Sequence, residues 1–183
     1  MSLKHLLQVP ARSSAAVLTA GAAALSGVAL AAPAQAAPFY VEISPQSAPG
    51  KAIADSVSGS GFGNVVLRTD STANSQRWEM KQVANLGGSK LAFNYINKEG
   101  GCLDVANKSR VSGVKLVVAQ CDGSFSQQWI RDFSVNTTFL ETQNRNSGLF
   151  MTADSTTSGT ELKQRVAVGS FGQFWSVFGA DPQ

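Results

Sequence analysis

Short apolar runs separated by turn-forming residues dominate the chain after residue 37. Apolar and β-branched residues alternate or cluster in these runs, and Gly, Ser, Asn and Asp interrupt them about every ten residues. No stretch in this part has a clear 3.6-residue period, so the pattern predicts short β-strands rather than helices. The clearest predicted strands are Phe39–Ser44, Asn64–Arg68, Leu91–Ile96, Val114–Ala119, Thr137–Thr142 and Glu161–Val166.

The first 36 residues follow a different pattern. Lys4 and Arg12 make the start positive, Ala15–Leu30 is an uncharged run rich in Ala and Gly, and Ala34–Ala36 has the small-x-small form of a cleavage site. This pattern predicts a secretory signal peptide over residues 1–36 and an extracellular mature protein. A membrane anchor is the alternative, but the apolar run is short and is followed by a proline and the cleavage site. Residues 37–183 have the length of one domain.

The mature part contains an internal threefold repeat. Each of its three tryptophans has a glutamine two residues earlier, and the tryptophans are 51 and 46 residues apart. We expect repeats of about 38–83, 84–133 and 134–181, each with about four strands, closing on one another so that few sheet edges stay open. The tryptophan rings would lie in the shared core and the glutamine amides would bind backbone. The motif residues are Gln76, Trp78, Gln127, Trp129, Gln173 and Trp175.

Charge and composition exclude several classes of function. The chain has a net charge of +3, and removal of Lys4 and Arg12 leaves 13 basic and 12 acidic residues. A nearly neutral mature chain favours neither nucleic acid nor a membrane surface as a partner. The only histidine, His5, leaves with the signal peptide, which excludes Ser-His-Asp and Cys-His catalysis and histidine metal sites. The acidic residues are dispersed, so we expect no enzyme activity, no metal and no cofactor.

Two cysteines, Cys102 and Cys121, lie in the middle repeat. Export and an even count favour a disulfide, whereas two free thiols are the alternative. A bridge over this distance would stabilise the fold by about 3 kcal/mol.

The segment Gly-Gly-Cys-Leu-Asp-Val at residues 100–105, together with the three Gln-x-Trp motifs, resembles the ricin B-type lectin family. The resemblance covers essentially the whole mature chain and implies an all-β fold, the β-trefoil, of about twelve short strands. It also implies a disulfide between Cys102 and Cys121. The Ala-rich signal peptide is similar to those of secreted actinobacterial proteins.

The family resemblance implies a sugar site that is only partly present in the middle repeat. Asp104 matches the carboxylate that accepts hydrogen bonds from sugar hydroxyls, and Gln127 matches the closing amide. Ser126 stands where Asn or Asp is usual, Val117 replaces a polar residue, and Ala119 replaces the stacking ring. Two nearby residues are further candidates: Phe125 as a substitute ring, or a partly buried residue, and Asn107 as a hydroxyl contact, or a turn residue. Asp104 itself has the alternative role of binding local backbone.

The equivalent positions in the outer repeats have lost these groups. In the first repeat Ala54 takes the carboxylate's place, with Asp55 one residue later and therefore on the other face of a strand. Arg68 stands at the ring position of that repeat. In the third repeat Thr152 and Arg165 stand at the carboxylate and ring positions.

Two functions follow from this pattern. The first is a secreted, non-catalytic, lectin-like module that binds a galactose- or xylose-type glycan weakly through Asp104, Asn107, Phe125, Ser126 and Gln127. The second is a β-trefoil with decayed sugar sites that binds a protein, in the manner of a protease inhibitor, because arginines are frequent interface anchors.

Overall fold

The computed structural model describes residues 38–57, 59, 62–134 and 138–179, and the predicted signal peptide lies outside them. The described part contains thirteen β-strands and four single-turn 3-10 helices, η1–η4. The strands are β1 (Tyr40–Pro45), β2 (Lys51–Asp55), β3 (Val65–Thr69), β4 (Trp78–Asn85), β5 (Lys90–Asn97), β6 (Cys102–Val105), β7 (Leu116–Ala119), β8 (Trp129–Asp132), β9 (Leu140–Glu141), β10 (Gln143–Asn144), β11 (Phe150–Ala153), β12 (Leu162–Arg165) and β13 (Phe174–Gly179). The 3-10 helices are η1 (Asn74–Gln76), η2 (Ala106–Lys108), η3 (Phe125–Gln127) and η4 (Phe171–Gln173).

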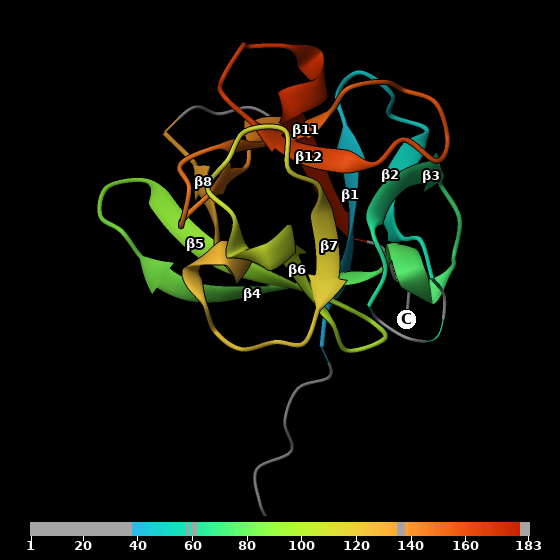
Figure 1. The fold of residues 1–183 in the computed structure, drawn as a ribbon, viewed down its shortest axis with the longest axis horizontal. Coiled ribbons are helices and arrows are strands. Elements are labelled where there is room, and N and C mark those ends of the chain that lie inside the picture. Colours follow the sequence, from blue (N-terminus) through green and yellow to red (C-terminus); the bar gives the residue numbers. More distant parts are fainter. Residues whose placement is uncertain (1–37, 58, 60–61, 135–137, 180–183) are drawn as a thin grey trace, which may run out of the picture. The chain divides into compact units, whose positions relative to one another are not determined.

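Strands from all three repeats close into a barrel (Figure 1). Hydrogen-bonded neighbours follow the order β10, β8, β5, β4, β1, β13, β9, and the pairs are antiparallel. Only Thr142 separates β9 from β10 along the chain, so the path returns to its starting point. A closed ring pairs the backbone groups that an open sheet would leave at its edges.

Three hairpins, one from each repeat, complete the fold: β2–β3, β6–β7 and β11–β12. Isolated bridges join them in pairs, at Asn64 with Val117, Val66 with Glu161, and Lys115 with Lys163. The three hairpins therefore meet around one centre, as in a β-trefoil (Figure 1). This arrangement confirms the predicted all-β trefoil class.

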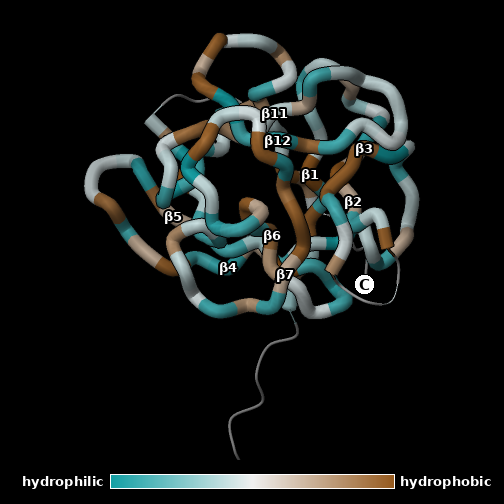
Figure 2. The backbone as a smooth tube through the Cα atoms, viewed as in Figure 1, coloured by the Kyte–Doolittle hydropathy of each residue, from teal (hydrophilic) through white to brown (hydrophobic). Residues whose placement is uncertain are grey.

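The core is filled from the inward faces of these strands. Trp78, Trp129 and Trp175 are fully buried. Each indole N–H donates to a backbone carbonyl of its own repeat, at Ile53, Leu103 and Met151, over 3.0–3.2 Å. Figure 2 shows apolar residues along strands such as β1, β3 and β7, while most connecting loops are hydrophilic.

All six runs with predicted strands contain a strand or part of one, but one run differs in form. The run predicted as a single strand at Thr137–Thr142 contains β9 as the only strand among its described residues, 138–142, and Thr142 separates β9 from β10. This interruption gives thirteen strands where about twelve are expected. A disulfide joins Cys102 to Cys121, which confirms the pairing implied by the family resemblance.

Candidate functional site

The glutamine of each Gln-x-Trp motif binds backbone in the same way in all three repeats. Its Oε1 accepts a hydrogen bond from the backbone N–H five residues earlier, and its Nε2 donates to the carbonyl seven residues earlier. These bonds close the loop before each motif and fix where the amide points. The donors are Ser71, Asp122 and Val168, and the acceptors are Thr69, Gln120 and Val166.

The same amide nitrogen makes one more contact, and this contact differs between the repeats. Gln127 Nε2 donates to Asp104 Oδ2 over 3.1 Å, and Gln173 Nε2 donates to Thr152 Oγ1 over 3.1 Å. Ala54, which offers no acceptor side chain, occupies the equivalent place in the first repeat, directly after the carbonyl that accepts the indole N–H. Ala54, Asp104 and Thr152 are therefore structurally equivalent.

Asp104 is held firmly and is largely covered. It is 4% exposed. Its Oδ1 accepts the N–H of Val105 over 2.6 Å, and its Oδ2 accepts the Gln127 amide. An ionised carboxylate has about four acceptor positions, so each oxygen keeps capacity for one more donor. Val117 lies directly opposite on β7 and offers no polar group.

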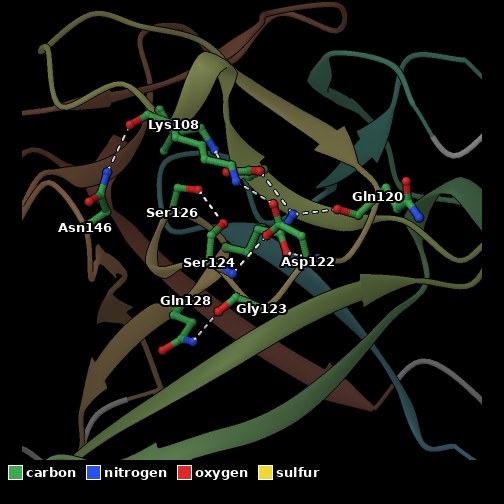
Figure 3. Close-up of polar contacts among 11 residues, drawn as sticks. Lys108, Gln120, Asp122, Gly123, Ser124, Ser126, Gln128 and Asn146 are labelled. Atoms are coloured by element: carbon green, nitrogen blue, oxygen red, sulfur yellow. Dashed lines mark hydrogen bonds and ion pairs between the residues drawn. The ribbon is translucent and has the colours of Figure 1, made fainter.

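Figure 3 shows an ion pair between Lys108 and Asp122 in the middle repeat. Lys108 Nζ is 2.5 Å from Asp122 Oδ2, and both side chains are substantially exposed. The bond from Lys108, followed by bonds from Ser124, holds the pKa of Asp122 well below its usual value. The pKa of Lys108 is raised mainly by Asp122, with a smaller contribution from the charge of Asp104. The ammonium group therefore lies within the field of both carboxylates.

The remaining predicted residues of the middle repeat are divided between the surface and the interior. Phe125 is 54% exposed, and the guanidinium carbon of Arg145 lies 4.2 Å from its ring centroid. Asn107 is exposed and has a left-handed φ of 55°. Ser126 and Gln127 are buried, and the Ser126 carbonyl accepts the Asn144 amide over 2.7 Å. The structure thus brings Asp104 and Gln127 together and leaves Asn107 and Phe125 as surface groups.

The third repeat has a cavity where the sequence pattern predicts a lost site. The cavity has a volume of about 330 Å³, and its lining includes Thr152, Asp154, Arg165 and Ser170. Arg165 donates to Asp154 through Nε and Nη2 over 2.6 and 2.5 Å, and Lys163 Nζ lies 3.5 Å from Asp154 Oδ2. The bonds from Arg165 lower the pKa of Asp154, which therefore stays ionised.

Asp154 is a candidate residue that reasoning from the sequence missed. It follows Thr152 by two residues and lies directly after the end of β11, where it meets Arg165 from β12. Its place two residues after Thr152 is the signal in the sequence that points to it.

The first repeat offers no comparable group. Ala54 and Asp55 are both buried, and Asp55 Oδ1 accepts the N–H of Val57 over 3.0 Å. A Cβ atom on Gly63 would come within 2.1 Å of the same oxygen, so backbone closes over this carboxylate. Arg68 is exposed and donates one long bond, of 3.4 Å, to the Ser56 carbonyl.

Among the described residues, no group of three or more His, Cys, Asp and Glu side chains is placed to hold a metal ion. Within the same residues, no helix has the length and apolar character needed to cross a bilayer.

Solved structures with this fold share it at low sequence identity. The designed threefold-symmetric protein ThreeFoil is 23% identical with a TM-score of 0.67, and the match covers 76% of this chain and 97% of ThreeFoil. An exo-beta-1,3-galactanase from Clostridium thermocellum is 22% identical with a TM-score of 0.66, over 77% of this chain and 30% of that one. The lectin of Polyporus squamosus, solved with a human-type influenza-binding epitope, is 17% identical with a TM-score of 0.64, over 78% and 49%. The chain spans about a third and about half of these last two proteins.

No curated protein sequence gives a significant match. The sequence profile of the family described as ricin-type beta-trefoil lectin domain-like matches residues 74–165, which is half of the chain. The chain therefore belongs to the ricin-type β-trefoil lectin domain-like family.

Proposed function

We propose that this protein is a secreted, non-catalytic module that binds a carbohydrate through its middle repeat. The observation that carries the proposal is the bond from Gln127 Nε2 to Asp104 Oδ2. This bond and the one from the Val105 N–H fix the carboxylate in one orientation while leaving acceptor capacity on both oxygens. A fixed carboxylate can accept hydrogen bonds from two adjacent hydroxyls of a pyranose, which is the recognition that galactose- or xylose-type sugars need.

Lys108, which lies within the field of this carboxylate, is paired with Asp122. Exposed ion pairs contribute about 0–1 kcal/mol, so a ligand can displace the lysine at little cost. Phe125 then offers the exposed face of its ring, although Arg145 already covers part of it. One carboxylate without a free stacking platform supports weak binding, in the millimolar range, which corresponds to about 4 kcal/mol.

The test is an NMR titration of the ¹⁵N-labelled protein with galactose, lactose, xylose and xylan oligomers. Asp104→Asn keeps the shape of the side chain but removes the charge, and Asp154→Asn makes the same change in the third-repeat cavity. We expect shifts around Asp104 in the unmodified protein and in Asp154→Asn, and none in Asp104→Asn. Shifts that Asp154→Asn removes instead would move the site to the third repeat. Equal binding by both variants, or no binding by the folded unmodified protein, would refute the site.

Export is tested separately. The whole chain expressed in a secreting host should be found in the culture medium with the mass of residues 37–183. Retention of the full-length chain in the membrane fraction would favour the anchor alternative.

The protein-binding alternative depends on Arg68, which is exposed and held by one long bond. Arg165 supports it less, because Asp154 already occupies its guanidinium. The test is to capture partners from culture fluid with the unmodified protein and with Arg68→Ala. A protein that only the unmodified form captures would favour this alternative, provided that the same preparation binds no sugar.

A further inference from the structure

Another cavity lies away from the Gln-x-Trp loops, where β1 begins and β8 and β13 end. Its volume is about 550 Å³, within the range of small-molecule sites. Seven of its ten lining residues are apolar side chains: Phe39, Val41, Met80, Phe133, Leu140, Val177 and Phe178. Such a lining offers few partners for the hydroxyls of a sugar and suits a hydrocarbon or aromatic body.

Three phenylalanines stand at the surface around this cavity. Phe39, Phe133 and Phe178 are 64%, 45% and 46% exposed. Phe133 also packs edge-to-face against the buried ring of Phe93, with ring centroids 6.1 Å apart. Large exposed apolar side chains that gather beside a cavity mark a contact surface rather than ordinary surface composition.

A buried arginine gives the cavity its chemical character. Trp129 and Arg131 share the inward face of β8, and Arg131, which lines the cavity, is only 3% exposed. Its Nη2 donates to the Trp175 carbonyl over 2.8 Å, and its Nη1 makes a long bond of 3.4 Å to Thr142 Oγ1. Within the part of the chain that the structure describes, no carboxylate pairs with this guanidinium.

The two described bonds of Arg131, both to neutral oxygens, leave N–H donors that an anion could bind. A guanidinium carries five N–H donors, of which Arg131 uses two, and a buried charge needs a counter-charge or further hydrogen bonds to offset its lost hydration. A carboxylate accepts two parallel N–H bonds from a guanidinium, and this geometry is stronger than bonds to neutral carbonyls. A ligand with one carboxylate and an apolar body would satisfy Arg131 and fill the apolar lining together.

We infer that the cavity binds an amphipathic organic acid, with its carboxylate on Arg131 and its hydrocarbon body among Val41, Leu140 and Val177. This site is independent of the proposed sugar site, because it uses neither Asp104 nor Asp154.

The experiment compares decanoate with decanol by isothermal titration calorimetry on the whole protein. The two probes share the chain length and differ in the charged group. We expect decanoate to bind at least tenfold more tightly than decanol. In Arg131→Met the decanoate affinity should fall to that of decanol, whereas the decanol affinity should not weaken. Phe39→Ser should weaken both probes by a similar factor.

Equal affinities for the two probes in the unmodified protein would overturn the inference, as would the absence of binding by either. This comparison needs no variant, so it stays decisive if Arg131→Met fails to fold. Arg131→Lys, which keeps the charge, should then bind decanoate more weakly than the unmodified protein but more tightly than it binds decanol. A different result would identify a membrane contact instead. In that case neither probe binds, the ligand-free protein binds phosphatidylcholine vesicles, and Phe39→Ser loses the vesicle binding.

Discussion

Glu42 should make the fold less stable as the pH rises towards neutrality. Its Oε1 lies 3.0 Å from Arg77 Nη1, and the two side chains are 15% and 7% exposed. An ion pair alone would lower the pKa of a carboxyl group. Here burial, followed by the hydrogen bond with the Asp70 side chain, raises the pKa of Glu42 to about 7, and Arg77 offsets only part of the rise. Desolvation and a second carboxyl group therefore outweigh the arginine.

The size and sign of the effect follow from this rise. A change from 4.5 to about 7 has an upper limit of about 3.4 kcal/mol, and solvent screening near the surface reduces it to about 1–2 kcal/mol. Below pH 4.5 the carboxyl group is protonated in both states, so its contribution to stability is fully present. Between pH 4.5 and about 7 the carboxyl group ionises in the unfolded chain but stays protonated in the fold. This contribution to stability is therefore lost as the pH rises to about 7. The only histidine is His5, so no imidazole after residue 36 titrates in this window.

Urea denaturation at half-unit steps from pH 4.5 to 8 measures this dependence. The free energy of unfolding of the unmodified protein should fall by about 1–2 kcal/mol over this range, and Glu42→Gln should remove most of the fall. Glu79→Gln, on the neighbouring strand β4, is the matched control and should keep it. An unchanged slope in Glu42→Gln would refute the reasoning, and so would a rise in stability towards pH 7.

Three further changes test the scaffold by urea denaturation. Gln173→Ala removes bonds to Val168, Val166 and Thr152 from a buried site and should cost about 2–4 kcal/mol; a loss below 1 kcal/mol would contradict the role of this amide. Trp129→Phe leaves the buried Leu103 carbonyl without its donor and should cost about 1–3 kcal/mol, whereas an unchanged midpoint would show that water replaces the indole. Reduction of the Cys102–Cys121 bridge should cost about 3 kcal/mol, and the double variant Cys102→Ser, Cys121→Ser should then be insensitive to reductant.

The fold could be predicted because its determinants are local and repeated. A tryptophan with a glutamine two residues earlier ends one repeat, and three such pairs at similar spacing define the threefold plan. The break at Thr142 was not predictable in the same way. Leu140–Asn144 pairs with β13 through its first half and with β8 through its second half, so the interruption depends on which neighbours meet it.

The cavities were harder to predict because they depend on contacts between distant segments. The alternation in Trp129–Asp132 places Arg131 on the same face as a core tryptophan, but the sequence alone does not show that the arginine reaches the Trp175 carbonyl. The third-repeat cavity likewise depends on Arg165 folding back on Asp154, eleven residues earlier. Arg131 is a charged residue buried against the usual pattern, so a hydrophobic pattern does not predict its site.

The two roles of the Gln-x-Trp glutamine explain why the scaffold and the binding site can diverge in this chain. Its two backbone bonds are present in every repeat, whereas its contact with the neighbouring strand reaches a carboxylate at Asp104, a hydroxyl at Thr152 and no acceptor side chain at Ala54. The tryptophan of the first repeat is nevertheless as deeply buried as the other two. The fold therefore does not require a carboxylate at this position, since alanine or threonine also fits the scaffold, and Asp104 is the group on which the proposed sugar binding depends.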